Sequence, residues 1–146
     1  MLFRSVTGKE MNILQGEIIA REAHGSVCLL TVQAGGVQLS ASLLAQPAVW
    51  QQWDCGRAVS LQVPEMDVAI AKDFHGSCSI RNCLPAQITA IESGQILSRI
   101  LLSLTPQQQT LAAVITTRAV QQMQLQAGDA VQAMIDRKST RLNSSH

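Results

Sequence analysis

The chain has 146 residues, of which 47% are hydrophobic and 14% are charged, and its formal net charge is +1. This length suits one compact domain or two small β-barrels that share a core. The charge leaves no polybasic surface for a nucleic-acid backbone, and an aromatic content of 3%, with no Tyr, offers few platforms for stacking bases. Residues 1–16 are too polar for a secretion signal, and no apolar run approaches about 18 residues, so we expect a cytoplasmic protein without direct membrane insertion.

The first half of the chain consists of short runs rich in Val, Ile and Leu that are separated by Gly, Pro, Ser or Asp. Such runs are typical of β-strands. A tight hairpin turn is predicted at Gly35 and Gly36, because glycine adopts positive φ without a Cβ penalty. The expected strands are Leu14–Arg21, Val27–Gln33, Val37–Leu43, Ala58–Val63 and Val68–Lys72.

A connector at residues 73–78 leads to a second series of strands. In the clearest of these we expect Ile96, Ile100, Leu102 and Leu104 to face the core, because they share one side of the strand. The expected strands are Leu84–Ile91, Gln95–Leu104, Gln109–Thr116 and Ala130–Ile135. The pattern also predicts one helix over Thr117–Leu125, capped by Thr116 or Thr117, with Met123 and Leu125 packed in the core.

Both halves follow the same order of strand, hairpin, crossing segment and final strand, which indicates a tandem repeat. We therefore predict an all-β fold of two small OB-like five-stranded β-barrels, with a short helix in the second. A single continuous barrel is the alternative. The predicted organisation is a leader or linker at 1–13, a first barrel at 14–72, the connector at 73–78 and a second barrel at 79–135.

Residues 136–146 differ from the rest of the chain, because they are polar throughout except for Leu142. This run is similar to the translation of a sequencing-library adapter read into a truncated gene, so we exclude it from the fold and expect no strand there. The alternative is a natural disordered tail.

Reactive groups are sparse. The four cysteines, Cys28, Cys55, Cys78 and Cys83, lack the spacing of a zinc site, so we expect buried or idle thiols, with a Cys78–Cys83 disulfide as the alternative. His24 and His75 are isolated, and carboxylates such as Glu65 lie at expected turns and strand ends, where we expect them to be solvated. Nucleotide-binding, zinc-protease and serine-hydrolase motifs are absent from the sequence, so we predict that the chain is not an enzyme by itself.

Two groups of hydrogen-bond donors stand out. Ser79, Arg81 and Asn82 come immediately before the second barrel, and Thr116 and Thr117 begin the helix. A tetrahedral oxyanion needs hydroxyl, N–H and cationic donors within about 3 Å, and these residues include such donors. The structural alternative is that these side chains only cap a turn and a helix.

These residues belong to a longer pattern that resembles a known family. The opening S-I-R-N at 79–82, the run L-A-A-V-I-T at 111–116 and the ending L-Q-A-G-D-A-V-Q-A-M-I at 125–135 resemble a Mop or TOBE molybdate-binding domain. The preceding residues, from about Ala58, are similar to the segment that leads into this domain in the ATP-binding subunit of molybdate ABC importers.

The resemblance implies that Ser79, Arg81, Asn82, Thr116 and Thr117 bind molybdate, with tungstate as a second ligand, at barrel interfaces in a homodimer. No metal coordination by side chains is implied. It further implies a truncated regulatory region of an importer's ATP-binding subunit, in contact with the ATPase domain and the permease, and peripheral to the inner membrane. The alternatives are a free-standing molybdate storage protein and a ligand-free dimerisation module.

Overall fold

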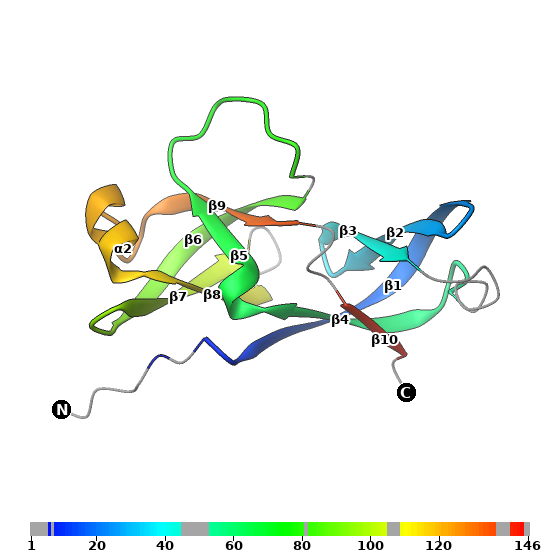
Figure 1. Cartoon of the computed structure of the whole chain (residues 1–146), viewed down its shortest axis with the longest axis horizontal. Coiled ribbons are helices and arrows are strands. Elements are labelled where there is room, and N and C mark those ends of the chain that lie inside the picture. Colours follow the sequence, from blue (N-terminus) through cyan, green and yellow to red (C-terminus); the bar gives the residue numbers. More distant parts are fainter. Residues whose placement is uncertain are drawn as a thin grey trace.

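The computed structural model describes residues 6, 8–44, 53–80, 82–104, 109–136 and 141–144 (Figure 1). Nearly all the regular structure is strand, as the alternating runs of Val, Ile and Leu predict. The elements are β1 (Met11–His24), β2 (Val27–Ala34), β3 (Val37–Leu44), β4 (Ala58–Pro64), the 3-10 helix η1 (Glu65–Asp67), β5 (Val68–Ala71), β6 (Asn82–Ser93), β7 (Leu97–Leu104), β8 (Gln109–Thr116), α2 (Thr117–Met123), β9 (Ala130–Ile135) and β10 (Arg141–Ser144).

The strands form two five-stranded sheets, and every pairing described is antiparallel. The first sheet has the order β10-β4-β1-β2-β3, and the second has the order β5-β9-β6-β7-β8. Each sheet is curled, and the two units lie end to end in Figure 1. The all-β fold of two five-stranded units, with one short helix in the second, is therefore confirmed.

The two units repeat one another in detail. The first strand of each is interrupted by a bulge at the same place, between Ile18 and Ala20 in β1 and between Ile88 and Ala90 in β6. Gly56 and Gly128 adopt positive φ of 92° and 97°, and their N–H groups donate to the carbonyls of Ile18 and Ile88. Glycine is required at both turns because a side chain strains this backbone. The predicted tandem repeat is confirmed.

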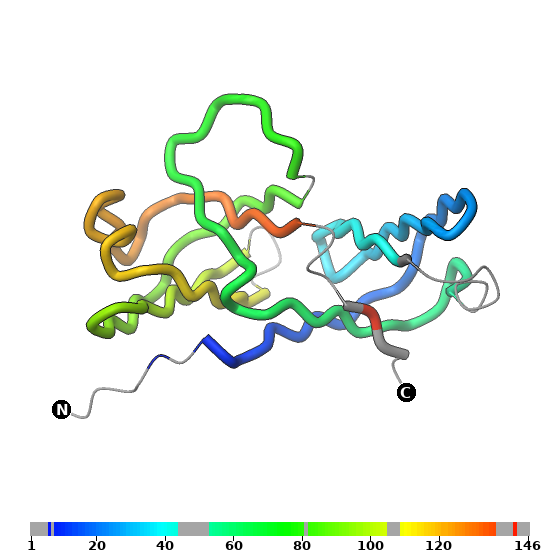
Figure 2. The backbone as a smooth tube through the Cα atoms, viewed as in Figure 1, coloured from blue at the N-terminus to red at the C-terminus, as the bar shows by residue number. Residues whose placement is uncertain are grey.

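The fifth strand of each sheet comes from the other half of the chain. β5 follows β4 in sequence but pairs with β9, and β10 follows β9 but pairs with β4 (Figure 2). The expected first barrel at 14–72 therefore gives its last strand to the second sheet. The expectation that residues 136–146 form no strand is wrong, because 141–144 pair with β4 and Leu142 packs against the core.

The core runs through both units as one cluster of buried aliphatic side chains. Its largest fully buried members are Ile18, Leu30, Leu39, Leu61, Ile88, Ile100, Leu102, Leu104 and Ile135. Ile96 was expected to join this face, but it is 77% exposed, because the turn after Ser93 continues through Ile96 and β7 begins only at Leu97. Alternation within a strand does not show where a turn ends.

The helix α2 is two residues shorter than predicted. Thr116 caps its N-terminus, and its C-cap, Gln124, adopts a left-handed conformation with φ of 54°. Lys72 donates to the carbonyls of Met123 and Gln124, which lie at the end of the helix. Leu125 is buried and Met123 packs against the core, as predicted.

Candidate functional site

Asn82 fixes the loop that carries the first predicted donor group. Its side chain is 3% exposed, its Oδ1 accepts from the N–H of Ser40 at 2.8 Å, and its Nδ2 donates to the Ser40 carbonyl at 2.9 Å. This amide therefore pairs with the edge of β3 as another strand would. Both polar groups of the Asn82 amide are therefore hydrogen-bonded within the chain, and these bonds position the residues before it. Ser79 is exposed in that loop, whereas Arg81 lies outside the described residues.

Asn12 of the first unit makes the equivalent contact with the second unit. Its Nδ2 donates to the Ala112 carbonyl and its Oδ1 accepts from the Ala112 N–H, both at 2.8 Å, on the edge of β8. The two asparagines thus tie each unit to the other reciprocally. Sequence analysis missed Asn12, although M-N-I-L at 11–14 corresponds to R-N-C-L at 81–84 in the repeat and could have identified it.

The two threonines of the second donor group have structural partners as well. Thr116 Oγ1 accepts from the N–H of Ala119 at 3.1 Å, which is the helix cap. Thr117 Oγ1 donates to the Gly94 carbonyl and lies 2.8 Å from Ser98 Oγ, so it fixes the turn between β6 and β7. Because Thr116 Oγ1 is the acceptor in its described bond, its O–H can still donate to a ligand, whereas the Thr117 proton is already used.

The described members of the two donor groups do not lie together within one chain. Asn82 is the first residue of β6, and Thr116 pairs with Leu97 beyond the last residue of that strand. The register therefore places them at opposite ends of the second sheet. The length of strand between them is on the order of 30 Å, at about 3.3 Å per residue. An oxyanion that contacts both groups would need them from two different chains.

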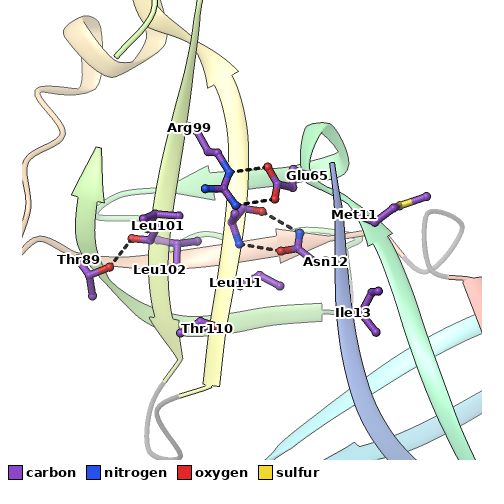
Figure 3. A pocket seen from close by; sticks show the side chains of 11 residues that line it. Met11, Asn12, Ile13, Glu65, Thr89, Arg99, Leu101, Leu102, Thr110 and Leu111 are labelled. Carbon is purple, nitrogen blue, oxygen red and sulfur yellow. Dashed lines mark hydrogen bonds and ion pairs between the residues drawn. The ribbon is translucent and has the colours of Figure 1, made fainter. Parts of the chain in front are cut away.

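A cavity of about 430 Å³ lies where β1 and η1 meet β7 and β8 (Figure 3). Its most prominent polar feature is the bidentate pair of Arg99 and Glu65, at 2.8 and 3.0 Å. The hydrogen bond to Glu65 holds the pKa of Arg99 above its ordinary value. Glu92 lies 3.6 Å from the same guanidinium, so the local charge does not favour an anion.

Glu65 was expected to be solvated, but it is 2% exposed. The expectation was wrong because η1 turns its side chain toward β7, where Arg99 neutralises it. A carboxylate at a predicted turn carries no sequence signal for a partner 34 residues away.

All four cysteines are free, so the alternative of a Cys78–Cys83 disulfide is not realised in this structure. Cys28 is buried, and burial raises the pKa of its thiol. Within the described part of the chain, no three His, Cys, Asp or Glu side chains gather as a metal site. No helix of the same part is long and apolar enough to cross a membrane.

Comparison with known proteins supports the resemblance seen in the sequence. Residues 78–142 match the TOBE domain. The matched residues include β6, β7, β8, α2 and β9 of the second unit, but not β5, and they end within β10.

Two known proteins are similar to this chain beyond residues 78–142. The chain is 27% identical over 119 residues to the molybdenum import ATP-binding protein ModC of Hahella chejuensis (strain KCTC 2396), covering 78% of this chain and 33% of that protein. It therefore spans about a third of that relative. The fold is also similar to a crystal structure of the cytoplasmic molybdate-binding protein ModG with molybdate bound, with a TM-score of 0.85, 23% identity, and coverage of 92% of this chain and 96% of that one.

Proposed function

We propose that this chain binds molybdate reversibly at a site that two copies complete. The observation that carries the proposal is the fold similarity to molybdate-bound ModG across both barrels, together with the TOBE match over 78–142. Tungstate has the same charge and tetrahedral shape, so it is expected to compete for the site.

The proposed ligands come from the two donor groups. Ser79 and Arg81 of one copy and Thr116 of the other copy contact the anion, while Asn82 and Thr117 position them through their bonds to Ser40 and Gly94. Charge-assisted hydrogen bonds contribute about 1.5–3 kcal/mol each, so four or five of them give micromolar affinity after desolvation of the dianion is subtracted. The separation of the two groups along β6 is the reason for invoking two copies.

The biological setting that we propose is the regulatory region of an importer's ATP-binding subunit, cytoplasmic and peripheral to the inner membrane through the permease. The match to about a third of ModC supports this setting. A free-standing molybdate storage protein is the second candidate, favoured by the similarity to nearly the whole of ModG. Genomic sequence on both sides of the segment separates them, because an in-frame upstream Walker A motif belongs only to the importer subunit. Neither candidate assigns catalysis to this segment itself.

Isothermal titration calorimetry with sodium molybdate tests the binding. We expect micromolar affinity for the wild type and at least a tenfold loss for Arg81→Ala and for Thr116→Val. Thr110→Val is the matched control, because Thr110 is exposed at the other end of the same strand. Absence of heat and of retained molybdenum in equilibrium dialysis would refute the function and favour the ligand-free dimerisation module.

A further inference from the structure

Two thiols flank the loop that carries Ser79. Cys78 is exposed and lies outside any strand, whereas Cys83 is half-buried and is the second residue of β6. Cys78 Sγ accepts a hydrogen bond from the Ile80 N–H at 3.4 Å, and Cys83 Sγ donates to the Ile80 carbonyl at 3.3 Å. Both sulfur atoms therefore contact the backbone of one residue between them.

These contacts limit the distance between the two sulfur atoms. Three covalent bonds separate the nitrogen and the carbonyl oxygen of a residue, so the sulfurs lie within about 10 Å of each other. Cys83 is held by its pairing with Met134, and the adjacent Asn82 is clamped to Ser40. Cys78 has no strand pairing, so it is the partner that can approach until the Cα atoms reach the roughly 4.4–6.8 Å that a disulfide requires.

The other two cysteines are placed differently. Cys28 is fully buried in the core, which keeps oxidants away from its thiol. Cys55 is exposed, but it lies in the turn beside Gly56, next to β4 of the first sheet. Cys78 and Cys83 are the two that share a contact residue and have access to solvent.

We propose that Cys78 and Cys83 form a reversible disulfide bond with each other. The oxidant is a low-molecular-weight disulfide, such as oxidised glutathione. The Cys78 thiolate attacks one sulfur of oxidised glutathione, which forms a mixed disulfide and releases one reduced glutathione. Cys83 then loses its proton to solvent and attacks the Cys78 sulfur, which forms the internal bridge and releases the second glutathione. Two protein thiols are oxidised and one glutathione disulfide is reduced.

The bridge closes a six-residue ring around Ser79, Ile80, Arg81 and Asn82. Cys83 cannot then donate to the Ile80 carbonyl, because the sulfur no longer carries a proton. The loop that presents the first donor group thus responds to the thiol redox balance. Only the relevance of this response to molybdate rests on the proposed function.

Mass spectrometry of the intact chain tests the proposal without molybdate, so its failure leaves the proposed function unaffected. After incubation with oxidised glutathione, we expect a loss of about 2 Da in Cys55→Ser, and in the wild type the same bridge together with a glutathione adduct on the exposed Cys55. Both should give a peptide map that joins Cys78 to Cys83 and be fully reversed by dithiothreitol. Cys83→Ser should instead stop at one glutathione adduct on Cys78. A stable adduct on Cys78 of the wild type, or a bridge that involves Cys55, would overturn the proposal.

Discussion

Replacing Asn12 with leucine tests the reciprocal contact between the two units. The Asn12→Leu variant keeps the branching of the side chain at Cγ but leaves the Ala112 N–H and carbonyl without partners, and Asn12 and Ala112 are 8% and 4% exposed. Two lost hydrogen bonds and two unpaired buried groups together cost about 2–4 kcal/mol. For a chain of this length, this lowers Tm by about 5–15 °C.

Urea unfolding followed by far-UV circular dichroism measures the effect. Asn82→Leu should cost less, about 1–2 kcal/mol, because its bonds to Ser40 are only partly buried and water can replace them. Gln38→Leu is the control, since Gln38 is exposed on the same strand as Ser40. An unfolding free energy of Asn12→Leu within about 0.5 kcal/mol of the wild type would refute the assigned role, because surface substitutions already reach that size.

Three further substitutions test separate parts of the fold. Arg99→Gln should lower the unfolding free energy by about 2 kcal/mol in urea titrations, because it leaves the Glu65 carboxylate buried without its bidentate partner; an unchanged midpoint would contradict this. The hydrogen bond from the Gln126 N–H, and then Lys72, hold the pKa of Asp129 below its ordinary value of about 3.9. Its contribution to stability is therefore present above that value and lost as pH falls through the lower folded pKa. Asp129→Asn should remove this part of the pH dependence of stability, which lies below about pH 4. Leu142→Ala should cost about 1–2 kcal/mol through lost packing of β10, and thermal unfolding equal to the wild type would show that the strand adds nothing.

Most of the strands could be predicted because alternation of apolar and polar side chains is a local property. Val37–Leu44 and Gln109–Thr116 begin and end within one residue of their expected limits. The exchange of β5 and β10 could not be predicted in this way, since pairing partners are set by tertiary packing. β10 shows the limit most clearly, because its polar sequence lacks the alternation but still completes the ladder beside β4.

The sequence predicted which residue types the candidate site contains better than it predicted where those residues lie. Ser79 and Thr116 were selected as donors from their residue types, and both are exposed. Their separation at opposite ends of the sheet depends on register, which the sequence does not state. Asn82 was selected as a ligand, but its amide completes the edge of β3, because an unpaired strand edge accepts any well-placed donor and acceptor.

Complementation between two variants tests the shared site most directly. Arg81→Ala and Thr116→Val chains are unfolded, mixed and refolded together, and the number of high-affinity molybdate sites is measured by calorimetry. If each site takes Arg81 from one copy and Thr116 from the other, mixed dimers contain one intact site, and roughly a quarter of all sites return. No recovery in the mixture, with binding intact in the wild type refolded in parallel, would contradict a site built from two copies.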